Sequence, residues 1–286
     1  MLKLLKSGFY TTVQDGGRLP WRPNGVPVSG TMDDLARKRI NKILENPIDC
    51  SLLEITMTGP TLLFQRETFI CLGGAVMSAT LNNKPIGNYT VQKIKEGDIL
   101  SYGRLENGFR AYLGIKGGFQ GQKVLGSVSQ YAPLTTKSSL GDGDLLPYPI
   151  TRAFEPKLSD LKVVDYLHTK TLEVFQGPEY DMLTTEQLEA LFNNTHLIAK
   201  ENDRMAYQLE ETIPGHDCTV LTSATLPGTV QLTPAGKLII LMKDGQTTGG
   251  YPRILQLSTL AIATLSQKKA GDSIQFLRAS KSPIAI

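Results

Sequence analysis

Residues 244–253, with the sequence DGQTTGGYPR, concentrate groups that could act on a small polar molecule. Gln246, Thr247, Thr248 and Tyr251 supply an amide and three hydroxyls, and Asp244 stands at the start of the segment. Three glycines, among them Gly249 and Gly250, allow the backbone to approach a ligand closely. Such groups suit the orientation of a carbonyl or an amide. The alternative is a polar connection whose side chains satisfy their own backbone.

The flanking sequence indicates which elements hold this segment. The apolar run Leu238–Met242 precedes it and is typical of a buried strand. Behind it, apolar residues recur at helical spacing, namely Ile254, Leu257, Leu260, Ala261 and Leu265. We therefore expect the segment to connect a strand to a helix.

A second group of candidates lies near the N-terminus. Gln14, Asp15 and Arg18 border a loop rich in glycine and proline. Asp33 falls in the first turn of a helix predicted over residues 31–45, with Thr31 as its cap. A carboxylate there also interacts favourably with the helix dipole, so a purely structural role for Asp33 stays open.

Several chemistries lack their sequence signals. The chain has no Walker A motif, no Gly-x-Gly-x-x-Gly after a strand and no Gly-x-Ser-x-Gly elbow. Its three histidines are not spaced with one another or with cysteine as metal ligands, so we expect no metal site. What remains is chemistry by carboxylates, arginines, hydroxyls and backbone amides. These groups can polarise a carbonyl or bind a carboxylate.

The composition limits the surroundings and partners. A net charge of +3 over 286 residues gives no reason to expect binding to nucleic acid or to an anionic membrane. No apolar run approaches the ~20 residues needed to span a bilayer, and the N-terminal residues lack the features of a signal peptide. Three scattered cysteines indicate a reducing compartment, so we expect a cytoplasmic protein.

Short apolar runs separated by glycine and proline predict a mainly β protein with a few short helices. A second helix is expected after Thr184, with Gln187 completing its capping box. The halves also echo each other: residues 59–64 resemble 228–232, and residues 95–100 resemble 269–274. We therefore predict two related β-barrel units, residues 1–150 and 151–286, with a junction within residues 151–170.

Several blocks of the chain resemble the biotin-dependent carboxyltransferase family, also called the allophanate hydrolase subunit 2 family. The blocks are TTVQDGGR at 11–18, GVPVSGTMD at 25–33, LEIT at 53–56, GPTL at 59–62, GG at 117–118, VLGS at 124–127, QGP at 176–178, NDRM at 202–205 and QTTGGYP at 246–252. They occur in the same order as in the family and cover nearly the full chain. Two departures are Leu19-Pro20-Trp21, where the family has glycine and an aromatic residue, and Val128, where it has arginine. They leave open whether activity is reduced.

The resemblance implies two cyclophilin-like β-barrel units and a heteromeric complex. The family's stand-alone members include the C subunit of 5-oxoprolinase, which implies a part of an ATP-dependent complex that hydrolyses 5-oxoproline to L-glutamate. The implied partners are an allophanate hydrolase subunit 1-type protein and a LamB/YcsF-type subunit, with ATP bound by this chain or its partner. One alternative is a carboxyltransferase component that moves a carboxyl group from carboxybiotin to an amide such as urea. Another is a regulatory protein that antagonises a kinase inhibitor by sequestering it.

The resemblance also implies roles for individual residues. Asp15, Arg18, Asp33 and Asp244 become candidates for catalysis, the carboxylates as bases or as ligands of a metal–nucleotide. The implied substrate-binding residues are Gln14, Ser29, Arg204, Gln246, Thr247, Thr248, Gly249, Gly250 and Tyr251. For Arg18 and Arg204 the alternative is that each ties a loop to a neighbouring aspartate. We expect the N-terminal segment and the 246–251 turn to serve one cleft.

Overall fold

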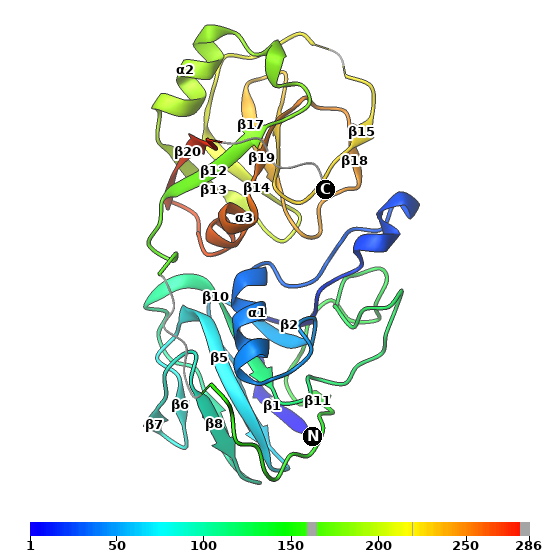
Figure 1. The fold of residues 1–286 in the computed structure, drawn as a ribbon, viewed down its shortest axis with the longest axis vertical. Helices are drawn as coiled ribbons and strands as arrows, with labels where there is room; N and C mark the ends of the chain where they lie inside the picture. Colours follow the sequence, from blue (N-terminus) through cyan, green and yellow to red (C-terminus); the bar gives the residue numbers. More distant parts are fainter. Residues whose placement is uncertain (159–164, 219, 281–286) are drawn as a thin grey trace. The chain divides into compact units, whose positions relative to one another are not determined.

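The structure, a computed structural model, describes residues 1–158, 165–218 and 220–280. It is mainly β and 13% helical, which confirms the predicted fold class (Figure 1). The chain forms two units: unit 1 comprises Met1–Arg18 and Ser29–His168, and unit 2 comprises Leu19–Val28 and Thr169–Ile286. None of the helices within the described residues is long and apolar enough to cross a membrane.

Unit 1 contains two antiparallel sheets. The first has the strand order β11-β1-β4-β9-β6-β7 and the second the order β2-β3-β10-β5-β8. Their strands are β1 (Leu2–Lys6), β2 (Tyr10–Gln14), β3 (Leu52–Thr56), β4 (Thr61–Phe64), β5 (Thr68–Val76), β6 (Thr80–Leu81), β7 (Lys84–Pro85), β8 (Val91–Ile94), β9 (Ile99–Ser101), β10 (Asn107–Ile115) and β11 (Leu145–Leu146).

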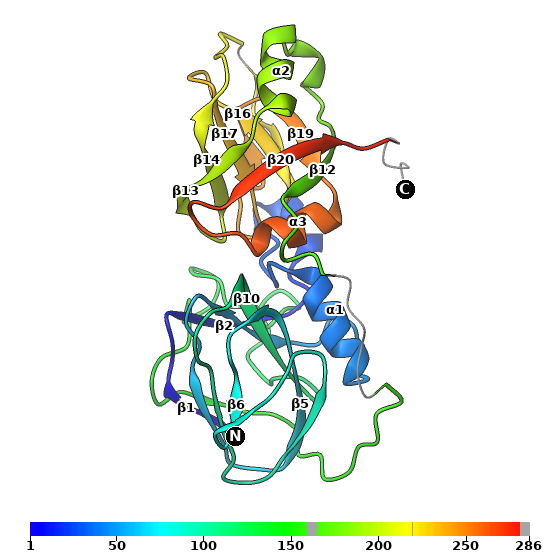
Figure 2. The same ribbon diagram turned by 90° about the vertical axis from the view of Figure 1, so that its left-hand side faces the viewer.

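The second sheet of unit 1 is covered on both faces. On β5, Ile70 and Leu72 face the main core that both sheets share, whereas Phe69 and Cys71 pack with helix α1 (Asp34–Ile43). This alternation follows from the two-residue period of a strand. Figure 2 shows α1 running along this sheet beside β5. Asp33, not Thr31, caps α1, because its side chain accepts a hydrogen bond from the Ala36 N–H.

Unit 2 is a closed barrel with the strand order β12-β19-β16-β17-β14-β13-β20. Figure 2 shows β20 crossing beside β12, its parallel neighbour, and β13, its antiparallel neighbour. The strands are β12 (Thr171–Gln176), β13 (His196–Asn202), β14 (Ala206–Thr212), β16 (Thr229–Leu232), β17 (Lys237–Leu241), β19 (Arg253–Leu257) and β20 (Ser273–Arg278). A further pair, β15 (Ser223–Ala224) and β18 (Thr248–Gly249), lies outside the barrel sheet.

Helical segments accompany the barrel: two short 3₁₀ turns, η1 (Leu19–Asn24) and η2 (Tyr180–Met182), and the longer helices α2 (Thr185–Asn193) and α3 (Thr259–Ser266). The predicted capping box of α2 is confirmed, since Thr184 and Gln187 hydrogen bond to each other's backbone N–H. The helix predicted after residue 253 was wrong over residues 254–257. This stretch is strand β19, and α3 begins only after its N-cap, Ser258.

One of the two sequence echoes corresponds to the same turn in both units. The Asp98 carboxylate accepts from the Lys95 N–H at 2.7 Å, and the Asp272 carboxylate accepts from the Lys269 N–H at 2.9 Å. In each turn the intervening glycine has positive φ, 89° and 82°, and a strand follows. The other echo differs in pairing, because β4 pairs with β1 and β9 whereas β16 pairs with β17 and β19.

The unit boundary differs from the expected one. Residues 151–158 and 165–168 group with unit 1, and the N-terminal segment Leu19–Val28 groups with unit 2. The change of unit falls between His168 and Thr169, inside the predicted junction, of which residues 159–164 lie outside the described residues. Tyr166 anchors the end of unit 1, because its hydroxyl donates a hydrogen bond to the Asp33 carboxylate.

Candidate functional site

The segment 244–251 joins two strands of the unit 2 barrel rather than a strand and a helix. It leaves β17, forms the short strand β18 and enters β19. Strand β18 pairs with β15, so that Thr248 lies opposite Ala224 and Gly249 opposite Ser223. The segment is therefore a folded structure with its own backbone pairing, and its side chains start from defined positions.

A buried ion pair fixes the start of the segment. Arg204 donates from Nε to Asp244 Oδ2 at 2.8 Å and from Nη2 to Oδ1 at 3.1 Å, a bidentate geometry. The two side chains are only 7% and 12% exposed. The backbone N–H of Asp244 also donates to the Arg204 carbonyl. Arg204 thus ties its loop to an aspartate that is distant in the sequence.

Gln246 is hydrogen bonded to a second glutamine, Gln231, which sequence analysis did not identify as a candidate. Gln246 Nε2 donates to Gln231 Oε1 at 3.4 Å, and Gln231 Nε2 donates to the Tyr251 carbonyl at 3.4 Å. Gln231 is buried on β16. A Cβ at Gly249 would stand 2.6 Å from Gln231 Nε2, so a larger residue there would displace the Gln231 amide. The buried Gln246 Oε1 has no hydrogen-bond partner among the described residues, so it is an acceptor open to a ligand.

The backbone of the segment is held by residues far away in the sequence. Thr225 donates from Oγ1 to the Gln246 carbonyl at 2.6 Å and from its N–H to the Thr247 carbonyl at 3.0 Å. Arg22, from the segment that groups with unit 2, donates to the carbonyls of Thr225 and Thr247. Thr248 and Tyr251 are exposed. The carbonyls are therefore occupied while these two side chains reach solvent.

Arg253, at the end of the segment, is paired with Glu179. Its guanidinium makes two hydrogen bonds to the carboxylate, at 2.9 and 2.7 Å, and its N–H makes a third. These bonds lower the pKa of Glu179, with the Arg253 side chain as the largest cause, and raise the pKa of Arg253. Both charges are committed to holding β19 against the loop before η2.

In unit 1, Asp15 organises the loop 124–130. Its carboxylate accepts four hydrogen bonds, from the hydroxyls of Ser127 and Ser129 and from the N–H groups of Gly17 and Val128. The distances lie between 2.6 and 2.8 Å. Proton transfer by Asp15 would require these bonds to be given up, so the geometry favours a positioning role; a catalytic role stays a prediction.

Arg18 and Gln14 hold the same loop. Arg18 is fully buried and donates to the carbonyls of Val124, Ser127 and Ser129. Gln14, also fully buried, donates to the Gln130 carbonyl at 3.1 Å. Arg18 thus binds backbone carbonyls of this loop. A contact with substrate would require the loop to open.

Ser29 follows the loop segment and is backbone-constrained. Its φ is 55°, in the left-handed region that serine rarely adopts, and Gly30 follows with φ 79°. A Cβ at Gly30 would lie 2.9 Å from the Asp15 carbonyl, to which Thr31 donates a hydrogen bond. The buried Ser29 Oγ has no partner among the described residues. The strained position and open hydroxyl keep Ser29 a candidate for binding.

Asp33 belongs to a buried network that sequence reasoning missed. Besides capping α1, it accepts a hydrogen bond from Tyr166, and its N–H donates to the Tyr112 hydroxyl at 3.0 Å. Tyr112 in turn donates to Glu54 at 2.9 Å. Burial raises the pKa of both tyrosines, the charge of Asp33 adds to this for each of them, and the charge of Glu54 adds to it for Tyr112. Glu54 could have been found as a member of this network because it places a carboxylate within strand β3, all of whose residues are buried.

The candidate charges are thus mostly committed to other protein groups. Within the described residues no group of three or more His, Cys, Asp or Glu side chains could hold a metal ion. The groups left open toward a ligand are neutral: Gln246 Oε1, Ser29 Oγ, and the exposed Thr248 and Tyr251 side chains. In unit 2, such groups can orient an amide or accept its N–H, whereas transfer of a proton would need a group from elsewhere.

This β fold and its glycine-rich polar turn define a carboxyltransferase-type protein. The family model described as carboxyltransferase domain, subdomain A and B, matches residues 24–278, and the chain belongs to this family. Relatives share the similarity along nearly the whole chain. It is 32% identical to the C subunit of 5-oxoprolinase from Escherichia coli, over 98% of this chain and 92% of the relative. For the Haemophilus influenzae protein of the same name the identity is 29%, over 96% and 90%.

Larger proteins contain the same unit as a part. Urea amidolyase of Saccharomyces cerevisiae is 27% identical over 96% of this chain, which covers 16% of that protein. Among solved structures, TTHA0988 superposes with a TM-score of 0.88 at 26% identity, and this chain covers 55% of it. Urea amidolyase of K. lactis superposes with a TM-score of 0.87 at 28% identity, and 19% of it is covered. The chain therefore spans about half, or less, of these solved structures.

Proposed function

We propose that this protein is a subunit of an ATP-dependent 5-oxoprolinase complex that hydrolyses 5-oxoproline to L-glutamate in the cytoplasm. The observation that carries the proposal is the similarity to the Escherichia coli protein named as the C subunit of 5-oxoprolinase, which is 32% identical over 98% of this chain. The relatives named urea amidolyase are 29% and 27% identical over 94% and 96% of this chain. An allophanate hydrolase subunit 1-type protein and a LamB/YcsF-type protein are the proposed partners.

The open polar groups of unit 2 fit the recognition of a lactam. Gln246 Oε1 can accept the lactam N–H, and the hydroxyls of Thr247, Thr248 and Tyr251 can donate to its carbonyl oxygen. Gly249 and Gly250 keep the backbone accessible. Donors placed at that oxygen would stabilise the negative charge that develops when the carbonyl is attacked. In this proposal Asp244 and Arg204 hold the segment in place through their ion pair.

The described residues do not fit a nucleotide site. The sequence has no Walker A motif, and Asp15, Asp33 and Asp244 are each occupied by protein donors. A metal–nucleotide needs free oxygen ligands and a phosphate cradle. We therefore place ATP binding on a partner subunit, and no step here is assigned to ATP on this chain.

The test is reconstitution of the complex from this protein and its two proposed partners. We expect ATP-dependent release of glutamate from L-5-oxoproline, insensitive to avidin, and dependent on this chain. Gln246→Leu should reduce kcat at least about tenfold, whereas Gln275→Leu, an exposed glutamine on β20, should not. No glutamate from the complete, ATP-supplied set would refute the proposal.

A carboxyltransferase role is the second candidate, favoured by the family description and by the relatives named urea amidolyase. It would require a separate carboxybiotin carrier, because the chain has no biotin-attachment Met-Lys-Met sequence. Turnover of urea that needs a biotinylated partner and is abolished by avidin would support this function and exclude the first.

A further inference from the structure

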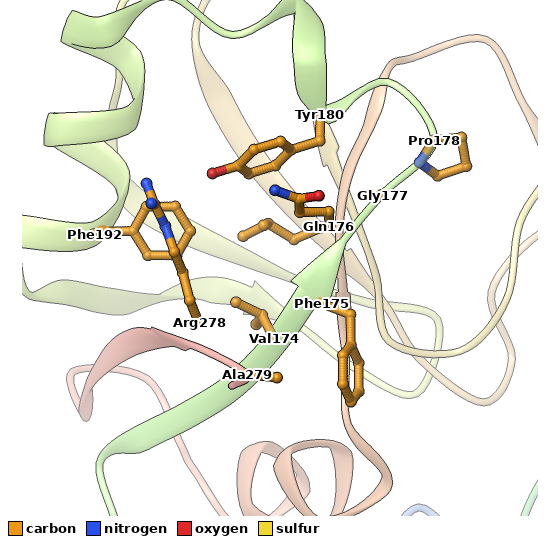
Figure 3. Close-up of a pocket in the computed structure, with 10 residues that line it drawn as sticks. Val174, Phe175, Gln176, Gly177, Pro178, Tyr180, Phe192, Arg278 and Ala279 are labelled. Carbon is orange, nitrogen blue, oxygen red and sulfur yellow. The ribbon is translucent and has the colours of Figure 1, made fainter. Parts of the chain in front are cut away.

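Unit 2 contains a cavity of about 580 Å³ at the ends of two parallel strands (Figure 3). Strands β12 and β20 run parallel with Val174 opposite Arg278, so they leave the sheet at the same edge. Their last residues, Gln176 and Arg278, line the cavity together with Tyr180 and Phe192. No residue of the 244–251 segment lines it. The cavity is therefore a second place on unit 2, of a size that small-molecule sites have.

The side chains on one face of each strand change from apolar to polar where β12 and β20 reach the cavity. On β12, Leu172 and Val174 are buried at alternate positions, and the next position on that face is Gln176. On β20, Ile274 and Phe276 are buried, and the next position is Arg278. Side chains two residues apart share a face of a strand, so an apolar row ends in an amide and a guanidinium on neighbouring strands.

Arg278 is held by an aromatic ring rather than by an acid. Its guanidinium carbon lies 4.3 Å from the centre of the Phe192 ring, which projects from α2. Within the described residues it makes no ion pair and no side-chain hydrogen bond. Stacking occupies the face of the guanidinium and leaves its N–H edges for a carboxylate, which they can bind with two bonds.

Two neutral groups complete the polar side. Gln176 and Tyr180 make no side-chain hydrogen bond within the part of the chain that the structure describes. Figure 3 shows the Tyr180 hydroxyl, the Gln176 amide and the Arg278 guanidinium directed toward the same space, whereas the Phe175 ring points away from it. An amide offers both donors and an acceptor, and a phenol can do either, so they match a ligand amide.

We propose that this cavity binds a small carboxylic acid that also carries an amide. The carboxylate lies at Arg278, the amide meets Gln176 and Tyr180, and the apolar body contacts Val174 and Phe192. 5-Oxoproline belongs to this chemical class, and only the choice of probe rests on the proposed function. The site is distinct from Gln246 and its neighbours, so its loss and the loss of catalysis are separable.

The probe is L-5-oxoproline, and its binding to the full chain is measured by saturation-transfer NMR and calorimetry. Arg278→Met should raise the Kd at least about tenfold, which corresponds to ~1.4 kcal/mol, and Gln176→Leu should raise it severalfold. Lys170→Met removes an exposed cation next to the start of β12 and should leave the Kd unchanged. The lactam 2-pyrrolidinone, which lacks the carboxylate, should bind at least about tenfold more weakly than L-5-oxoproline.

Binding that Arg278→Met and Lys170→Met alter equally overturns the assignment, as does no binding of L-5-oxoproline to the full chain. A loss of binding in Gln246→Leu as large as that in Arg278→Met would mean that the ligand sits at the 246–251 turn instead. Turnover by the reconstituted complex is scored separately. Turnover by the complex without 5-oxoproline binding at Arg278 would refute this inference alone. Binding at Arg278 without turnover would refute the proposed function alone.

Discussion

Breaking the Arg204–Asp244 ion pair should destabilise unit 2 far more than removing an exposed charge. The pair is bidentate and its side chains are 7% and 12% exposed. Replacing one partner leaves the other buried and unpaired, which typically costs 3–5 kcal/mol. Because some solvent still reaches the pair, we expect Arg204→Met to lower the free energy of unfolding by about 3 kcal/mol. With a urea dependence of ~2 kcal/mol/M, the unfolding midpoint falls by about 1.5 M.

The single tryptophan reports this unit selectively. Trp21 lies in the Leu19–Val28 segment that groups with unit 2, next to Arg22, which binds the Thr225 and Thr247 carbonyls. Urea unfolding followed by Trp21 fluorescence therefore measures unit 2. Lys200→Met is the matched control, since it removes an exposed cation from β13 of the same unit. Its expected effect is within about 0.5 kcal/mol.

A double-mutant cycle separates the pair from its surroundings. Arg204→Met combined with Asp244→Leu removes both charges, so the double variant should be at least about 1.5 kcal/mol more stable than the sum of the single effects predicts. Additive effects, or an Arg204→Met midpoint equal to that of Lys200→Met, would refute the view that this ion pair holds the start of the 244–251 segment.

Three further outcomes are expected. Gly177→Ala should destabilise unit 2 by several kcal/mol in the same urea assay, because a Cβ there would overlap a backbone carbonyl of β19. Gly250→Ala should be nearly neutral, because its Cβ would meet only the Val220 carbonyl, at 3.8 Å. Burial raises the pKa of Cys71 to about 12. At pH 8, iodoacetamide should therefore label the exposed Cys218 and should reach Cys71 only when unit 1 unfolds. Labelling is followed by mass spectrometry, and labelling of Cys71 before unit 1 unfolds would contradict this. The pKa of Glu179 is lower in the folded protein than its ordinary value of 4.5, so its ion pair with Arg253 stabilises unit 2 fully above pH 4.5 and is lost as the pH falls through the lower folded value. The difference in unfolding free energy between the wild type and Glu179→Gln should therefore shrink on acidification. A difference that stays constant with pH would exclude the ion pair as its source.

Helices and strands were predicted well where the residues within a segment determine its secondary structure. The mainly β class was predicted from short β-prone runs bounded by glycine and proline, and strand β4, which follows Gly59-Pro60, is such a run. The capping box at Thr184 is likewise local, since its partner is three residues away. Residues 254–257 were misassigned because five apolar positions between Ile254 and Leu265 fit a helical stripe, while the decisive pairing of β19 with β12 and β16 involves residues distant in sequence.

The roles of the site residues depended on such distant partners. Asp15 is bound by Ser127 and Ser129, more than 110 positions away, and Arg22 by carbonyls more than 200 positions away. Of the four donors to the Asp15 carboxylate, only Gly17 is a neighbour in the sequence. Motifs therefore located the residues, but the structure was needed to show which charges hold loops together. The pocket at Arg278 carried no motif beyond QGP, since its polar groups and the Phe192 ring come from four separate elements.

The distribution of committed and open groups indicates how this chain contributes to a reaction. In unit 2, Asp244, Glu179, Arg204 and Arg253 neutralise one another in pairs and position backbone. The groups directed at open space are an amide acceptor, hydroxyls and Arg278, and none of them is a carboxylate or an imidazole. We infer that the chain orients an amide-bearing acid and stabilises charge on it, while a partner supplies the proton-transfer groups. On this view Gln246→Leu lowers kcat without changing the pKa values in the pH–rate profile, because those belong to the partner; a shifted profile would assign the titrating group to this chain.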